Sequence, residues 1–161
     1  MLSRREPQLM QLLERNQIAE SYAELGVKDA DYPPSGSVVM RRYFGQTVTP
    51  SGQEAEVAAD AIEALGSWEE CLLWIKLWDV WPSTEDGPTH YAERGARGER
   101  RALDVALGHL FTAEERDTLL RFLKLVLENA WEAQLHTTTR GHLNSRSLRT
   151  SHDKHIDVYA L

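Results

Sequence analysis

An apolar run at residues 71–81 constrains the fold of this chain more than any other feature of its sequence. Only two of its residues are charged, and Trp, Ile and Val are frequent. The run is too short to cross a membrane as a helix, which takes about 20 residues, and Pro82 follows it directly. A short run of this composition that ends at a proline predicts a buried central strand. A helix capped by Ser67 and Glu70 is the alternative.

As a strand, this run would have two apolar faces, because successive side chains point to opposite sides of a sheet. One face would carry Trp74, Trp78 and Val80, and the other would carry Ile75, Leu77 and Trp81. Helices are therefore expected to cover both sides of the sheet.

Two helices are predicted in the first half of the chain from their apolar spacing. The first covers residues 7–25, with Pro7 in its first turn. The second begins at a capping box of Ser51 and Glu54 and ends before Gly66.

The strongest helix signal comes later in the chain. Thr112 and Glu115 have the spacing of a capping box. Apolar residues then recur at helical spacing, namely Leu119, Phe122, Leu123, Val126 and Ala130. Residues 108–111 lead into this helix. Residues 82–104 are rich in glycine and proline, and they predict a loop with one short helix around Tyr91.

Further strands are expected at residues 38–44, 131–135 and 156–160, with a short one around Leu148. The last three predict a C-terminal antiparallel hairpin. We therefore expect one α+β domain over residues 1–161. It would have a small mixed or antiparallel sheet, packed against three or four helices.

The composition indicates a soluble protein of a reducing compartment. Cys71 is the one cysteine, so no internal disulfide can form, and a lone cysteine in an apolar run is usually a small core residue. The N-terminus lacks the apolar segment of a signal peptide. Arginine outnumbers lysine, which suggests a GC-rich bacterial source. We expect a cytoplasmic protein without a membrane segment.

The acidic excess is concentrated between residues 53 and 70. The net charge is −7, and this stretch holds six acids and no lysine or arginine, whereas the remaining 19 acids and 18 bases almost balance. Helical geometry places Glu56, Asp60 and Glu63 on one wet face, which Glu69 and Glu70 extend. Such a face can simply keep a protein soluble. It can also attract a basic partner, and it disfavours nucleic acid.

Residues 151–157 contain the most suggestive chemical groups. Ser151, His152 and Asp153 are immediate neighbours, whereas a hydrolytic triad is assembled from distant positions, so this order predicts a turn. His152 and His155 are three apart on an expected strand, where their side chains diverge, and no metal site or cofactor is predicted. A pocket that combines His109, His152 and Asp153 in space remains an alternative.

Trp81, followed by Pro82 and Ser83, lies at a predicted strand end beside Glu85. Tryptophan is mostly a core residue, but it also anchors interfaces. We therefore add Trp81 and Glu85 to the acidic face as candidate partner-binding residues. The arginines at 94, 97, 100 and 101 alternate with acids, which is a weak signal for nucleic acid.

Several short motifs occur in a suggestive order. They are Cys71-Leu72-Leu73-Trp74, Trp81-Pro82-Ser83 with Glu85, Gly108-His109-Leu110-Phe111, Trp131, and Ser151-His152-Asp153. Over about residues 67–160 the chain resembles a family of small, uncharacterised bacterial proteins. It departs from that pattern at Leu107, where proline is expected, and at Lys154, where an acid is expected. The resemblance implies no activity. By analogy, small acidic proteins of this kind are similar to immunity proteins of polymorphic toxin systems.

The leading hypothesis is a non-enzymatic protein that binds and neutralises a basic, toxin-like partner. A small hydrolase that uses His109, His152 and Asp153 is the second hypothesis. A structural component of a larger assembly is the third, and a homo-oligomer stays open.

Overall fold

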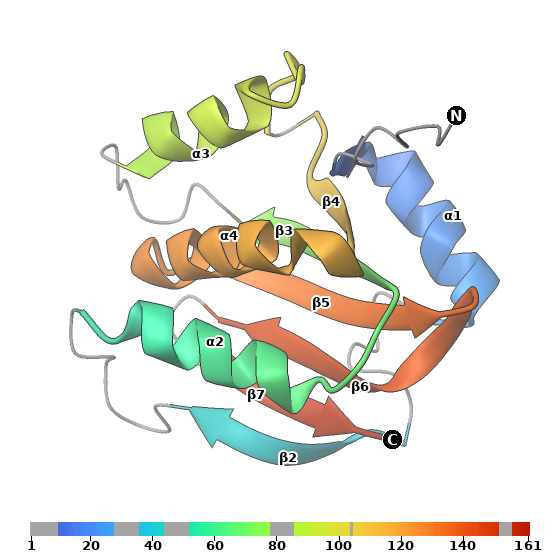
Figure 1. Ribbon diagram of the computed structural model, residues 1–161. Helices are drawn as coiled ribbons and strands as arrows, with labels where there is room; N and C mark the ends of the chain where they lie inside the picture. The colour runs from blue at the N-terminus through green and yellow to red at the C-terminus, as the bar shows by residue number, and fades with distance from the viewer. Residues whose placement is uncertain (1–9, 28–35, 44–51, 78–85, 104, 152–155) are drawn as a thin grey trace, which may run out of the picture.

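The computed structural model describes residues 10–27, 36–43, 52–77, 86–103, 105–151 and 156–161 (Figure 1). In these residues the strands are β1 (Gln11–Leu13), β2 (Val38–Tyr43), β3 (Glu70–Leu77), β4 (Gly108–Thr112), β5 (Glu132–Thr139), β6 (His142–Thr150) and β7 (Ile156–Ala160). The helices are α1 (Arg15–Leu25), α2 (Glu54–Ala64), α3 (Asp86–Gly95) and α4 (Arg116–Glu128), and a 3-10 turn, Ala113–Glu115, precedes α4.

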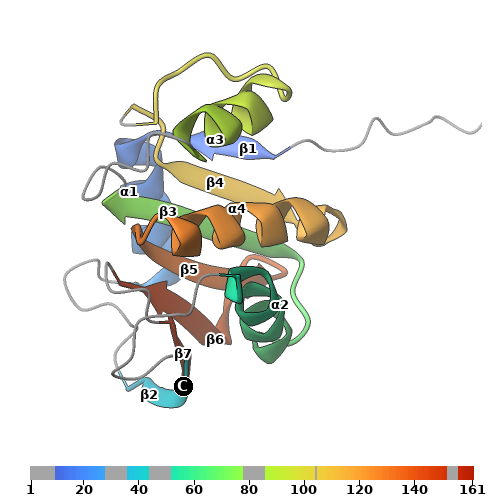
Figure 2. The same ribbon diagram turned by 90° about the vertical axis from the view of Figure 1, so that its left-hand side faces the viewer.

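The strands form one seven-stranded sheet in the order β1-β4-β3-β5-β6-β7-β2, and all neighbouring pairs are antiparallel. Helices α2 and α4 lie on one face of this sheet, and α1 lies on the other (Figures 1 and 2). The predicted α+β class is confirmed, and the sheet is larger than expected. No helix in the described part of the chain is long and apolar enough to cross a membrane.

Strand β3 is central, as predicted, because it pairs with β4 on one side and β5 on the other. Its side chains from Cys71 to Ile75 are all buried, and burial raises the pKa of the Cys71 thiol. By alternation, Leu73 faces α2 and α4, whereas Leu72 and Trp74 face α1. Residues 78–81, which the prediction included in this strand, lie outside the described residues.

The first helix begins later than predicted. Leu12 and Leu13 belong to β1, and α1 starts at Arg15 because the side chain of Gln17 accepts a hydrogen bond from the Glu14 backbone N–H at 2.8 Å. The apolar pair Leu12 and Leu13 fits the spacing of a helix as well as that of a strand, so the sequence pattern does not distinguish the two structures here. A Cβ on Gly108 would lie 2.8 Å from Ile18 Cγ1, so glycine allows α1 to cross β4 this closely.

The capping box before α4 is confirmed, since the Thr112 backbone N–H donates to Glu115 Oε2 at 3.0 Å. Phe122 and its neighbours on the predicted stripe are buried, but the helix ends at Glu128, and Ala130 adopts a positive φ of 54°. Residues 108–111 form strand β4 rather than a lead into the helix.

The C-terminal strands form the expected antiparallel arrangement. Strands β5, β6 and β7 pair in sequence order. Arg140 and Gly141 link β5 to β6, and both have positive φ, as a type I′ hairpin requires. Helix α3 is the short helix predicted around Tyr91, and α2 matches the predicted second helix. Its proposed cap, Ser51, lies outside the described residues.

Candidate functional site

The predicted acidic face is present on α2. Glu56, Asp60 and Glu63 are exposed along one side of the helix, while Ala58, Ala61 and Ile62 on the other side enter the core. We call these three acids the acidic stripe. Asp60 Oδ2 lies 3.5 Å from Arg41 Nη1 of β2, and both side chains are more than half exposed. This ion pair is therefore weak, but it shows that β2 lies beside the stripe.

Of the two acids predicted to extend the stripe, Glu70 lies on the opposite face of the sheet. Glu69 accepts a hydrogen bond from the Arg140 backbone N–H at 3.0 Å, at the β5–β6 turn. Glu70 lines a cavity together with residues of α1, on the opposite face of the sheet from α2. Trp81 and Glu85, the other predicted partner-binding residues, lie outside the described residues.

Apolar side chains are exposed next to the stripe, at the end of the sheet formed by β2. Val38, Val39 and Met40 are 65%, 44% and 39% exposed. The C-terminal Leu161 is 56% exposed and follows Ala160, which pairs with Val38. We call these four residues the apolar edge. In the described residues, only Val105 is a further exposed large hydrophobic side chain.

Strand β2 is the last strand in the sheet order, and it pairs with β7. Figure 1 shows β2 beneath α2, and Figure 2 shows β1 and β2 at opposite ends of the sheet. Sequence reasoning predicted this strand but not its place, because the order of strands depends on pairings with residues more than 100 positions away.

His109, the histidine of the alternative catalytic pocket, is completely buried on β4. Arg94 Nη1 lies 3.0 Å from its Nε2. The rings of His90 and Phe122 lie 5.4 and 5.1 Å from its ring. Burial, followed by the nearby His90 and Arg94, holds the pKa of His109 well below its usual value. A neutral imidazole enclosed in this way has no route to a substrate. His152 and Asp153 lie outside the described residues.

Arg94 is also buried, and it has a structural position rather than a phosphate-binding one. Its guanidinium donates to the backbone oxygens of Ala106, at 2.8 Å, and Arg101, at 3.2 Å. Arg101 forms an ion pair with Glu99, and its side-chain hydrogen bond lowers the pKa of Glu99 to about 2. Arg94 and Arg101 of the arginine-rich stretch therefore form hydrogen bonds and ion pairs within the protein itself.

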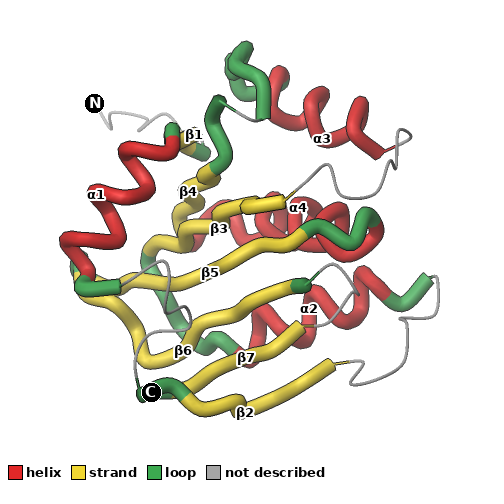
Figure 3. The backbone as a smooth tube through the Cα atoms, turned by 180° about the vertical axis from the view of Figure 1, so that it is seen from behind, coloured by secondary structure: helices red, strands yellow, loops and turns green. Residues whose placement is uncertain are grey.

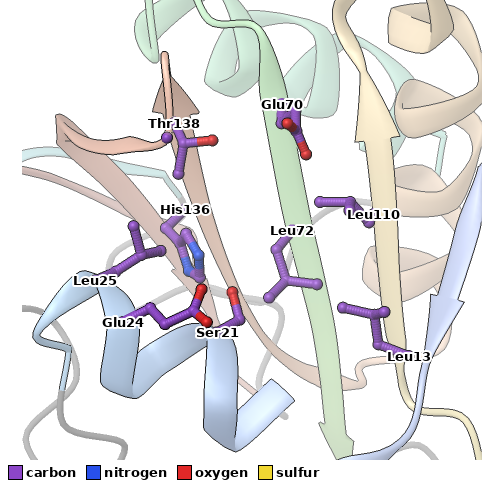
Figure 4. Close-up of a pocket in the computed structure, with 10 residues that line it drawn as sticks. Leu13, Ser21, Glu24, Leu25, Glu70, Leu72, Leu110, His136 and Thr138 are labelled. Carbon is purple, nitrogen blue, oxygen red and sulfur yellow. The ribbon is translucent and has the colours of Figure 1, made fainter. Parts of the chain in front are cut away.

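A cavity of about 170 Å³ lies between α1 and the sheet, on the face opposite the acidic stripe. Figure 3 views the molecule from the side on which α1 covers the sheet. Figure 4 shows the side chains that line the cavity. Leu13, Leu25, Leu72 and Leu110 form its apolar walls, and the polar side chains are Ser21, Glu24, Glu70, His136 and Thr138. These residues come from α1 and from four neighbouring strands.

His136 is the most unusual group in this lining. It is 1% exposed, and burial lowers its pKa to about 4, so the ring is neutral at neutral pH. Tyr22 packs edge-on against it, with ring centres 5.1 Å apart. In the described structure, its Nδ1 has no hydrogen-bond partner. The sequence analysis did not predict this cavity, because its lining comes from α1 and from strands that are distant in the sequence.

No group of three or more His, Cys, Asp or Glu side chains in the described ranges is arranged to hold a metal ion. Comparisons of the chain with protein-family models, with curated proteins and with solved structures found no match.

Proposed function

We propose that this chain is a non-enzymatic protein-binding protein that recognises a basic partner through the acidic stripe and the apolar edge. The observation that carries the proposal is their adjacency. Four of the five large hydrophobic side chains exposed in the described residues lie at one end of the sheet. Val38 lies on the sheet face that carries α2 and its three acids, whereas Val39, which pairs with Tyr159, points to the opposite face. Exposed apolar groups that gather next to charges are typical of interaction surfaces.

The two parts of this surface would contribute differently to binding. Val38, on the same sheet face as the acids, offers apolar contact beside them, and burial of such a side chain adds binding energy. The acids would steer a basic partner and raise its association rate, and this effect weakens with salt. Strand β2 also offers an edge to which an extended segment of the partner could add.

The class of partner that we propose is a basic toxin domain, which this chain would neutralise as immunity proteins do. The support is the net charge of −7, together with the analogy between small acidic proteins of this kind and immunity proteins. The burial of His109 is the reason that we prefer a binding protein to a hydrolase. A role in a larger assembly would use the same apolar edge, and self-association through that edge would be seen as an oligomer in solution.

Charge reversal tests the acidic stripe. A photo-reactive residue at position 38, which is exposed on the sheet face of α2, would first trap the partner in the producing cell, and the purified partner would then be used as the probe. With E56K/E63K we expect an association rate at low salt that is about ten- to a hundredfold lower, because the steering charge is inverted. Asp60 is left in place, so its ion pair with Arg41 is kept. Stopped-flow mixing measures the rate.

The matched control is E20K/E114K, which makes the same charge change at two exposed acids of α1 and of the 3-10 turn before α4. Its rate should stay within about threefold of the wild-type rate, because only the long-range field changes. Equal effects of the two variants would mean that net charge, and not the acidic stripe, controls association.

A further inference from the structure

We propose that the cavity between α1 and the sheet binds a linear aliphatic diammonium ion. This inference does not depend on the partner-binding proposal, because the cavity lies on the opposite face of the sheet. Three properties of the lining carry it: carboxylates at two separated places, leucine walls between them, and a buried imidazole nitrogen without a hydrogen-bond partner in the described structure.

The two carboxylates are separated along the strand direction. His136 pairs with Leu72, and Glu70 lies two residues before Leu72 on the same strand. Two residues of a strand span about 7 Å. Figure 4 shows Glu24 on the side of His136 that faces α1, and Glu70 toward the other end of the cavity. A ligand that reaches both would need a positive group at each end.

The middle of the cavity suits an alkyl chain. Leu72 and Leu110 are cross-strand partners on β3 and β4, and Leu13 and Leu25 complete the apolar walls. Burial of methylene groups against these side chains removes apolar surface from water and is favourable. A volume of about 170 Å³ has room for a short chain but not for a bulky ring system.

His136 would complete the recognition of one ammonium group. Its ring is neutral, so one nitrogen carries a hydrogen and the other accepts one. Nδ1 is enclosed in the structure, so we expect the ring to turn when an ammonium group binds, with Nδ1 as the acceptor and Glu24 as the opposite charge. Because ammonium groups only donate hydrogen bonds, they match a site whose polar groups are carboxylates, hydroxyls and this acceptor.

Putrescine is the probe, and the ring proton signals of His136 in NMR spectra are the readout. We expect a saturable shift of these signals, with butylamine about tenfold weaker and butanediol without effect. The double variant E24Q/E70Q should weaken putrescine binding at least tenfold. H136Q should weaken it less, since it removes a neutral acceptor and keeps both charges.

The matched control for charge is E20Q/E114Q, which should bind putrescine as the wild type does. Equal binding of putrescine and butylamine would overturn the diammonium assignment. No saturable shift of His136, or a shift that E24Q/E70Q leaves unchanged, would overturn the site itself. Blocked lysine, which carries one ammonium on the same alkyl chain, should behave as butylamine does. If it binds as tightly as putrescine, the cavity takes protein side chains instead.

Discussion

Acidification from about pH 7.5 to about pH 5 is expected to lower the free energy of unfolding by about 4–6 kcal/mol, through three buried histidines. Burial lowers the pKa of His90 to about 3, with Arg94 as a second cause, and that of His136 to about 4. His109 is lowered as well. In the unfolded chain all three return to about 6.5.

The sign follows from which state binds the protons. Below about pH 6.5 the unfolded chain takes up protons that the folded chain excludes, so the stability that is fully present above this pH is lost as the pH falls. Each histidine contributes about 1.4 kcal/mol per pH unit once it is within this range. Since domains are stable by only about 5–15 kcal/mol, the loss is large enough to approach unfolding.

Urea unfolding at a series of pH values measures this effect. H136Q should reduce the slope of stability against pH by about one third, since one of three titrating groups is removed. H142Q, at an exposed histidine at the start of β6, is the matched control for the substitution. A stability that does not change between about pH 6.5 and pH 5 would mean that these histidines are not neutral and buried in the folded chain.

Replacement of Arg94 by methionine is expected to destabilise the fold by about 2–4 kcal/mol. The guanidinium supplies hydrogen bonds to the backbone oxygens of Ala106 and Arg101 and to the His109 ring. Methionine fills a similar volume but donates nothing, so these buried acceptors lose a donor. The bonds connect α3 to the segment that leads into β4, and their loss should loosen that connection.

R100M is the matched control, because Arg100 is exposed in the same stretch. It should change the free energy of unfolding by less than about 0.5 kcal/mol. The measurement is again urea unfolding at neutral pH. An R94M protein as stable as R100M would show that the buried guanidinium does not hold this region together. R94M should also raise the pKa of His90, because the neighbouring positive charge is gone.

Local signals account for the elements that the sequence predicted well. The apolar run around Leu73 and the capping box of Thr112 and Glu115 are each contained in a few consecutive residues, and both were confirmed. The start of α1 was predicted too early because glutamate is an uncommon N-cap residue. In addition, Leu12 and Leu13 fit the apolar spacing of a helix and of a strand equally well. Residues 108–111 are too few for a strand signal, yet they form β4 between β1 and β3.

The candidate sites depended more on tertiary structure. The acidic stripe follows from helical spacing within one element, so it could be predicted. The place of Glu70 on the other face follows from strand alternation, which the prediction of one continuous acidic patch overlooked. The apolar edge and the cavity of His136 depend on pairings between distant strands and on the position of α1. No local pattern in one sequence contains that information.

Hydrogen exchange of the chain in complex with its partner tests the central claim most directly. If the acidic stripe and the apolar edge form one binding surface, the amides of β2 (Val38–Tyr43) and of α2 (Glu54–Ala64) should exchange more slowly in the complex, while those of α1 (Arg15–Leu25) should be unchanged. Protection of α1 alone, with β2 and α2 as in the free protein, would contradict the account and would place the partner on the opposite face of the sheet.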